Sequence, residues 1–460
     1  MKIKFITLGC KTNQYETNAM EQKFLEAGHK ICEEKADVCV VNTCSVTNVA
    51  ERKSRQMLRK EKEKNPKAII VACGCYSQVA KSEIEKMPEV NIVLGINEKN
   101  NIVKIVEEYI NKNNKETISE VTDVMYDKEF KEFGTTTYTE LTRAVIKIQD
   151  GCDRFCSYCI IPYARGKVRS RKPQNIINEI EEISKAGIKE VVLTGIHIAS
   201  YGKDFNEKEE NELRKKYNYM EEYKKFDPKE DLSTGGFRLI ELLEQINKIE
   251  GIKRIRLGSI EPKLITEEFV IRLSKLDKIC EHFHLSLQSG CDDTLKRMNR
   301  RYTTEEFEKS VNLLRKYFSK VHLTTDIIVG FPGETEEEFK ITYDFLKKIK
   351  FYKMHIFKYS VRKGTKAEKM PNQIDPRIKE ERSKKLIELS NKNEEEYNLK
   401  MIDKTEDVLF EERDGVYFKG HTSNYVVVKV KTEENLENKI IKTKITNIEN
   451  LDVLGTCECK

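Results

Sequence analysis

Three cysteines stand close together in the segment 149–171, which reads QDGCDRFCSYCIIPYARGKVRSR. Cys152, Cys156 and Cys159 are separated by three residues and then by two. Zinc sites usually join a close pair of cysteines to a second pair further along the chain, and no fourth ligand follows nearby. Three thiolates instead hold three irons of a [4Fe–4S] cluster and leave the fourth iron open. The spacing predicts an open iron–sulfur site, with a zinc knuckle or three buried thiols as the alternative.

An open iron accepts an outside ligand, and the amino and carboxylate groups of S-adenosylmethionine (SAM) suit it. The spacing C-x3-C-x2-C with an aromatic residue, Tyr158, before the last cysteine resembles the radical-SAM signature. SAM is therefore the expected ligand of this site.

A second group of cysteines lies within residues 1–112, where short apolar runs alternate with helical patterns. Strands are predicted at 2–8, 37–42, 68–72 and 91–94. This alternation predicts a parallel sheet covered by helices. Cys10, Cys44 and Cys75 follow the first three strands, and ligands of open parallel sheets gather outside the carboxyl ends of the strands. The three cysteines are expected to meet at a second metal site; the alternative is buried free thiols.

Cys73 competes with Cys75 for the third position of this group. The two lie two residues apart and share a face in an extended chain. Cys75 is preferred because it sits in the turn after the strand, where Gly74 suits a close approach of the backbone to a metal. Three further cysteines are interpreted as buried or free thiols: Cys32, Cys39 and Cys280.

The rest of the chain predicts three further parts. Residues 113–140 are polar and are predicted to be a linker, and six strand–helix units follow in 141–360. Their strands are predicted near 144–148, 190–193, 253–257, 282–287, 322–329 and 352–359. Six parallel units predict a partial α/β barrel with its site at the carboxyl ends of the strands. A charged insertion, 203–236, is interpreted as a solvated excursion, with a substrate contact as the alternative.

The C-terminal part changes character. Residues 361–402 predict a helical connector, and 403–460 show short strand patterns between turns, which predict a small antiparallel barrel. The predicted fold class is thus α/β: a parallel N-terminal domain, a partial (β/α)6 barrel and a small C-terminal β-barrel.

The composition of the chain bears on its partners and on the compartment in which it works. The 460 residues hold 83 Lys and Arg against 77 Asp and Glu, so the net charge of +6 favours a polyanionic partner only weakly. The sequence has no apolar run of about 18 residues, so no membrane span is expected. Thirteen cysteines in this lysine-rich chain fit a reducing cytoplasm better than a secreted disulfide framework.

Nine motifs in fixed order resemble those of the methylthiotransferase family of the radical-SAM superfamily. They are TLGCKTNQYET (7–17), VNTCSVT (41–47), GCYSQ (74–78), QDGCDRFCSYCIIPYARG (149–166), LTGIHIASYG (193–202), SIEP (259–262), LSLQSGCDDTLKRMNRRYT (285–303), TDIIVGFPGET (325–335) and FKYSVRKGTKA (357–367). The resemblance extends over almost the whole chain. Its opening, GCKTNQYET, is similar to the MtaB branch, which adds a methylthio group to carbon 2 of N6-threonylcarbamoyladenosine at position 37 of tRNA.

The resemblance implies an enzyme with two [4Fe–4S] clusters and SAM as cofactors. By this resemblance Cys10, Cys44 and Cys75 hold an auxiliary cluster that carries the sulfur, and the cysteines of the 149–171 loop hold the cluster that cleaves SAM. Carbon 2 of adenine has an unactivated C–H bond, so the cofactor supplies the radical chemistry and the protein positions it. The C-terminal barrel resembles a TRAM domain, an RNA-binding module. The implied partners are tRNA and an unidentified electron donor and sulfur source.

Polar residues near the ends of the barrel strands are the predicted SAM contacts, with a fold-stabilising role as the alternative. They are Tyr158, Thr194, Gly195, Glu261, Gln288 and Asp326.

Basic and aromatic residues are the predicted RNA contacts. Alternate residues of an extended segment share a face, so four cations after the cysteine loop are expected to follow a phosphate backbone. They are Arg165, Lys167, Arg169 and Arg171, and a solvated basic loop is the alternative. Tyr425 lies among aromatic residues and lysines of the C-terminal barrel and is expected to stack on a base, although some of these aromatics belong to the core.

Two other functions are disfavoured by the sequence. A methylthiotransferase acting on isopentenyladenosine of tRNA or on a ribosomal protein is disfavoured by the opening motif. A non-catalytic iron–sulfur RNA-binding protein is disfavoured by the six-unit barrel and the open-iron spacing, because a sensor needs no SAM site.

Overall fold

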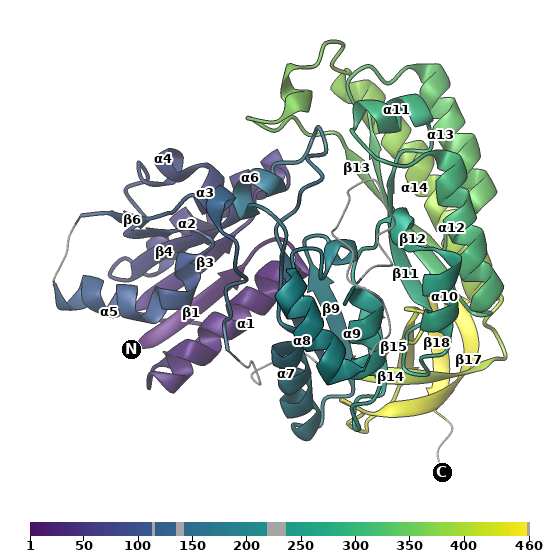
Figure 1. The fold of residues 1–460 in the computed structure, drawn as a ribbon, viewed down its shortest axis with the longest axis horizontal. Helices are drawn as coiled ribbons and strands as arrows, with labels where there is room; N and C mark the ends of the chain where they lie inside the picture. Colours follow the sequence, from purple (N-terminus) through teal and green to yellow (C-terminus); the bar gives the residue numbers. More distant parts are fainter. Residues whose placement is uncertain (113–115, 135–141, 219–235, 458–460) are drawn as a thin grey trace.

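The computed structural model describes residues 1–112, 116–134, 142–218 and 236–457. Three parts follow one another along the chain: a parallel sheet with its helices, a central set of parallel strands, and a closed β-barrel at the C-terminal end (Figure 1). No helix in these ranges is both long enough and apolar enough to cross a membrane.

The N-terminal sheet is entirely parallel, with the strand order β2-β1-β3-β4-β5-β6. Its strands are β1 (Lys2–Thr7), β2 (Lys30–Ile31), β3 (Val38–Thr43), β4 (Ile69–Gly74), β5 (Ile92–Leu94) and β6 (Ile118–Glu120). Its helices are α1 (Lys11–Glu26), α2 (Asn48–Lys64), α3 (Cys75–Val79), α4 (Lys81–Ile84) and α5 (Ile102–Asn111). Every side chain of β3 is buried, as expected for a central strand covered on both faces.

Part of the segment predicted to be a linker belongs to this sheet. Residues 118–120 form β6, which pairs in parallel with β5 and completes the edge of the sheet. The linker prediction for 113–140 is wrong here, because a three-residue edge strand is too short to show periodicity. The rest of that prediction falls partly on 113–115 and 135–140, which lie outside the described residues.

The central part holds the six predicted parallel strands in two sheets, β10-β9-β7-β8 and β11-β12-β13. The strands are β7 (Arg143–Asp150), β9 (Glu190–Gly195), β10 (Arg254–Leu257), β11 (His282–Gln288), β12 (His322–Val329) and β13 (Lys353–Lys358), and β8 (Arg169–Ser170) adds a short antiparallel pair to β7. Two isolated parallel bridges, Ile255–Ile279 and Ile260–Leu285, connect the two sheets. The mixed α/β fold therefore matches the predicted class.

Helices cover the outside of these strands and bury one large apolar core against them. They are α7 (Pro173–Lys185), α9 (Leu239–Ile246), α10 (Glu267–Ser274), α11 (Asp292–Arg297), α12 (Thr304–Tyr317) and α13 (Glu336–Ile349), with the short α6 (Ile161–Arg165) after the cysteine loop. α12 and α13 begin with capping boxes, in which Thr303 and Thr335 pair with the glutamates three residues later.

The insertion after β9 is anchored where it begins. α8 (Glu207–Tyr217) lies in it, and the buried Glu210 forms an ion pair of 2.7 Å with Arg238 at the start of α9. This part of the insertion is therefore tied to the fold rather than solvated throughout. Residues 219–235 lie outside the described ranges.

The C-terminal barrel is closed in the order β14-β15-β16-β18-β17. The long helix α14 (Pro376–Leu399) leads to strands β14 (Thr405–Asp414), β15 (Tyr417–Thr422), β16 (Val427–Lys431), β17 (Ile440–Glu449) and β18 (Asp452–Cys457). All neighbouring strands are antiparallel except β16 and β18. Two arginines of β10 fix the barrel to the central strands: Arg254 donates to the Asp407 carbonyl at 2.6 Å, and Arg256 to the Ser423 carbonyl at 3.0 Å.

A buried ion-pair network joins the N-terminal sheet to the central strands. Glu16 of α1 accepts hydrogen bonds from Lys99 at 2.6 Å, Lys147 at 2.7 Å and Arg165 at 2.7 Å. Asp150 accepts a further bond from Lys147 at 2.6 Å and one from Arg165 at 3.2 Å. All five side chains are buried, so each charge depends on the others for its stabilisation.

We expect Glu16→Ala to destabilise the protein strongly. The substitution leaves three buried cations short of a carboxylate, and breaking a buried pair costs about 3–5 kcal/mol. Thermal unfolding followed by circular dichroism measures the effect. Glu63→Ala, at an exposed position of α2, serves as the control and is expected to change stability by less than about 0.5 kcal/mol. Equal melting temperatures for the two variants would contradict the role assigned to the network.

Candidate active site

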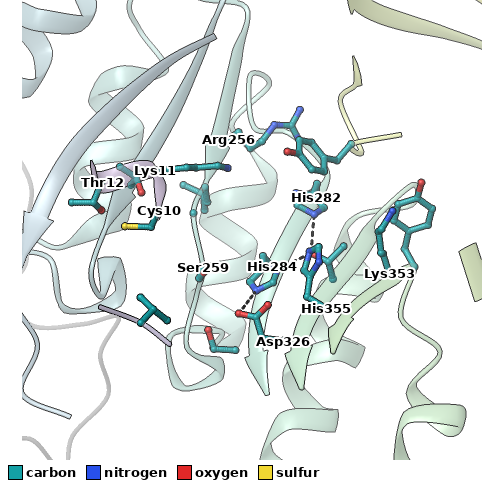
Figure 2. A pocket seen from close by; sticks show the side chains of 18 of the residues that line it. Cys10, Lys11, Thr12, Arg256, Ser259, His282, His284, Asp326, Lys353 and His355 are labelled. Atoms are coloured by element: carbon teal, nitrogen blue, oxygen red, sulfur yellow. Dashed lines mark hydrogen bonds and ion pairs between the residues drawn. The ribbon is translucent and has the colours of Figure 1, made fainter. Parts of the chain in front are cut away.

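One cavity of about 1160 Å³ collects residues from all three parts of the chain, and we call it the central cavity. Its wall includes Cys10 of the N-terminal part, Cys152 of the cysteine loop and Tyr425 of the C-terminal barrel. Figure 2 shows Cys10 and Lys11 on one side and the side chains of β11, β12 and β13 facing them. A site built from such distant segments can hold a large ligand between them.

Every residue predicted to contact SAM lines the central cavity. These are Tyr158, Thr194, Gly195, Glu261, Gln288 and Asp326. The three cysteines of the loop line it as well. The structure thus brings the predicted set together, and their roles toward SAM stay a prediction.

The loop cysteine group (Cys152, Cys156 and Cys159) lies between β7 and α6. Gly151 begins the loop with φ +71°, and a Cβ there would collide with the Lys167 carbonyl oxygen. Only glycine therefore fits this turn. Arg300 donates to the Cys156 sulfur at 3.2 Å. A guanidinium beside a sulfur stabilises thiolate charge, so this donor set fits an iron–sulfur cluster.

The N-terminal cysteine group (Cys10, Cys44 and Cys75) gathers at the carboxyl ends of β1, β3 and β4. Burial, and then the charges of Cys75 and Cys10, raise the pKa of the Cys44 thiol to about 11. Gly9 has φ +104°, and a Cβ there would lie 2.7 Å from the Cys44 sulfur. The Gly9 backbone thus lies directly against the N-terminal cysteine group, as the binding of a compact cluster there requires. Arg165 donates to the Cys75 sulfur at 3.3 Å.

The structure separates Cys75 from its rival Cys73. Cys73 lies fully buried on β4 among Val38, Val40 and Val71, and burial raises its pKa to about 12. Cys75 is the first residue of α3, and its charge interacts with Arg165 and then with Cys10. The structure therefore brings Cys75 to the other two cysteines and leaves Cys73 in the apolar core.

The basic run after the loop does not form the predicted RNA-binding row. Arg165, Arg169 and Arg171 are buried: Arg165 joins the Glu16 network, Arg169 donates to the Arg165 carbonyl at 2.7 Å, and Arg171 pairs with Glu179. The prediction is wrong for these three, because Arg165 ends α6 in the buried Glu16 network and the pairing of β8 with β7 carries the residues after it into the interior. Lys167 alone is exposed, and its contact with RNA stays a prediction.

Tyr425 does not present a free ring to a base. Its ring stacks on His282 and on His421, with centroid distances of 4.6 and 4.7 Å, and the Arg256 guanidinium lies 4.7 Å from the ring centroid. The predicted base-stacking role is therefore wrong in this structure, because histidines and an arginine already cover the ring. Tyr425 instead joins the barrel to the wall of the central cavity.

Sequence reasoning missed the partners of Glu261. Its Oε2 lies 2.6 Å from His197 Nε2 and 2.6 Å from Arg154 Nη2. Burial opposes ionisation, yet the His197 ring and then the Arg154 guanidinium lower the pKa of Glu261, so the cavity holds a fixed carboxylate. Both partners stand in the motifs at 193–202 and 149–166, so their place in these motifs was the available signal.

The opposite wall of the cavity carries histidines that sequence reasoning also missed. Polar atoms of His284, Asp326 and His355 lie within 4.8 Å of one another, and His284 Nε2 is 3.3 Å from Asp326 Oδ2 (Figure 2). This group can bind the polar groups of a ligand or a metal ion. The signal was the spacing of His282 and His284, which share one face of β11.

The fold and the loop cysteine group define a radical-SAM protein. Residues 146–346 match the model described as Radical SAM superfamily, and residues 2–95 match the one described as Uncharacterized protein family UPF0004. The radical S-adenosylmethionine methyltransferase TsrM of Kitasatospora setae is similar in structure, with a TM-score of 0.52 and 14% identity over 77% of this chain and 72% of that chain. That likeness concerns the fold alone.

Similar curated proteins show which family of radical-SAM proteins the chain belongs to. The chain is 40% identical to Threonylcarbamoyladenosine tRNA methylthiotransferase MtaB of Bacillus subtilis, over 96% of this chain and 93% of that one. It is 40% identical to MtaB of Aquifex aeolicus (93% and 96%) and 35% identical to tRNA-2-methylthio-N(6)-dimethylallyladenosine synthase of Caldicellulosiruptor saccharolyticus (96% and 89%). The chain belongs to the radical-SAM methylthiotransferase family, in its MtaB branch. It is an enzyme that uses SAM and [4Fe–4S] clusters.

We expect Gly9→Ala to impair the N-terminal cysteine group specifically. Its Cβ would collide with the Cys44 sulfur, whereas a Cβ at Gly28, with φ +82°, would meet no atom within 4 Å. Both substitutions carry the same kind of backbone strain, so Gly28→Ala is a matched control. Iron analysis after anaerobic reconstitution should give about half of the roughly eight irons of two clusters for Gly9→Ala, and nearly all for Gly28→Ala. Full iron content in Gly9→Ala would refute the role of Gly9 in making room for a cluster at the N-terminal cysteine group.

Cys75→Ala and Cys73→Ala test the choice between the two cysteines. Cys75→Ala should lose about half of the bound iron, since one of two clusters loses a ligand, while SAM cleavage persists. Cys73→Ala removes only a core thiol and should keep both clusters. The same measurement of iron, together with the yield of 5′-deoxyadenosine, distinguishes them. Loss of iron in Cys73→Ala alone would reverse the assignment.

Proposed function

We propose that this enzyme adds a methylthio group to carbon 2 of N6-threonylcarbamoyladenosine in tRNA. Support comes first from the two MtaB relatives at 40% identity over nearly the whole chain. Relatives named for dimethylallyladenosine are 34–36% identical, and MtaB of Thermotoga maritima is 33% identical, so identity alone separates the two substrates weakly.

The observation that carries the choice is the polarity of the central cavity. Lys11, His282, His284, Asp326 and His355 all line it. A dimethylallyl group is apolar and offers these side chains no hydrogen bonds beyond those they already make, such as that of His284 with Asp326. Each neutral polar atom that it covered without a partner would cost about 1–3 kcal/mol. A threonylcarbamoyl group brings a carboxylate, a hydroxyl and a urea-like linkage that match them.

We assign the loop cysteine group to the cluster that binds SAM and the N-terminal cysteine group to the auxiliary cluster. When bound, the two clusters and SAM would supply the electron that cleaves SAM, the sulfur, and the radical chemistry at carbon 2. The residues of the chain hold the reactants. Arg300 and Arg165 each donate to one sulfur of the two groups and stabilise its negative charge.

Glu261 is the proposed acceptor for the SAM amino group. Its bonds to His197 and Arg154 keep the carboxylate ionised and fixed in orientation. Thr194 and Gly195 lie at the end of β9, where hydroxyl and backbone groups face the same cavity. This arrangement favours cofactor binding at the carboxyl ends of the strands.

We propose that tRNA approaches along the C-terminal barrel, whose closed five-stranded form is consistent with a TRAM-like domain. Lys419 and Lys429 of this barrel line the mouth of the central cavity, and the exposed Lys167 adds a further positive charge. Cations at these positions suit contacts to phosphates. We further propose an electron donor and a sulfur source as partners, and a cytoplasmic location, which a tRNA substrate supports.

Nucleoside analysis tests the proposal. Reconstituted protein with SAM and a reductant is given tRNA that carries either N6-threonylcarbamoyladenosine or dimethylallyladenosine. We expect the 2-methylthio nucleoside only from the first tRNA. A product only from the second tRNA would assign the enzyme to the other substrate. Formation of 5′-deoxyadenosine without any methylthiolated nucleoside would point away from tRNA.

A further inference from the structure

Lys11 differs from every other cation that lines the central cavity. The others each have a partner: Arg154 with Glu261, Arg256 with Glu190, Arg300 with the Cys156 sulfur, Lys353 with Glu394, Lys419 with Asp414, and Lys429 with Asp452. The Lys11 ammonium forms no salt bridge or hydrogen bond with any residue in the described part of the chain. Its ammonium is thus the cation in this wall that remains available to a ligand.

The position of Lys11 connects it to the chemistry. It is the first residue of α1 and directly follows Cys10 of the N-terminal cysteine group. Figure 2 shows its side chain extending from beside Cys10 into the cavity, toward Arg256 and His282. The nearby carboxylate, Glu190, is already engaged by Arg256 at 2.8 Å. Lys11 is an exposed residue, so an anionic group of a ligand in this cavity can reach its ammonium.

We propose that Lys11 binds the carboxylate of the threonylcarbamoyl group and so selects the substrate. The inference rests on the proposed function, which places the modified base in this cavity. In the proposed function, the auxiliary cluster that the N-terminal cysteine group would hold supplies the sulfur, so the base would lie beside Cys10 and within reach of Lys11. The threonine carboxylate is the one anionic group that the modified base itself carries, and an ammonium is its natural partner.

The test uses an RNA anticodon stem-loop with N6-threonylcarbamoyladenosine and a matched stem-loop in which the threonine carboxylate is a neutral amide. Dissociation constants by fluorescence anisotropy, and methylthiolation rates, are compared for the wild type, Lys11→Met, Lys11→Arg and Lys353→Met. The wild type should prefer the acid by about 10- to 100-fold, the range of a charged hydrogen bond. Lys11→Met should lower this preference to about one.

Two variants separate charge from structure. Lys11→Arg keeps the positive charge and should retain most of the preference for the acid. Lys353→Met removes a cation of the same cavity whose charge is already paired with Glu394 at 2.9 Å, and its acid preference should equal that of the wild type. Iron content, measured for each variant, shows that the clusters are loaded.

Several results would overturn the inference. If Lys11→Met weakened the binding of both stem-loops equally, Lys11 would contact an RNA phosphate, because the two RNAs share all phosphates. An unchanged acid preference with a raised KM for SAM would mean that Lys11 binds the carboxylate of SAM. If the wild type itself fails to methylthiolate the acid stem-loop, the proposed function falls and the inference with it. If the wild type methylthiolates the acid stem-loop but Lys11→Met keeps the same preference for the acid over the amide, the inference alone is overturned.

Discussion

The buried carboxylate of Glu16 is the interaction on which the arrangement of the two cysteine groups depends. It is bonded to Lys99 of its own part of the chain and to Lys147 and Arg165 of the central part. Arg165 reaches from this carboxylate to the Cys75 sulfur. Because a buried charge is stable only while its partners stay in place, the network holds the N-terminal sheet and the cysteine loop at one fixed separation. The proposed reaction, in which sulfur comes from one site and the radical from the other, needs such a fixed separation.

The central cavity exists because the strands around it carry polar side chains on their inner face. Ordinary α/β barrels fill this space with layers of bulky apolar residues. Here β11 presents His282 and His284, and β12 presents Asp326, so the interior is polar and can take a polar ligand. The C-terminal barrel closes one end through Arg254 and Arg256, which donate to its backbone carbonyls. The strand β10, which carries both arginines, therefore docks the C-terminal barrel beside the cavity.

The two corrected RNA contacts have one physical cause. Period-two spacing shows which side chains share a face, but it carries no information on what that face meets. Arg165 meets Glu16 of α1, Arg169 meets the Arg165 carbonyl and Arg171 meets Glu179 of α7, while the ring of Tyr425 meets two histidines. β6 was missed for a related reason, since its pairing with β5 rather than its own pattern makes it a strand. In each case a partner distant in sequence decides the outcome.

The sequence by itself determined the fold class, the order of the six central strands, a small C-terminal β-barrel and the spacing of the loop cysteine group. These follow from local patterns. Apolar runs form strands, and the spacing of cysteines within a loop or after a strand does not depend on how the domains pack together. Only the tertiary structure decided that Cys75 rather than Cys73 faces Cys10, that the basic run is interior, and that Lys11 stands unpaired in the cavity. Those properties depend on burial and on charges from distant segments, which arise only when the parts of the chain come together.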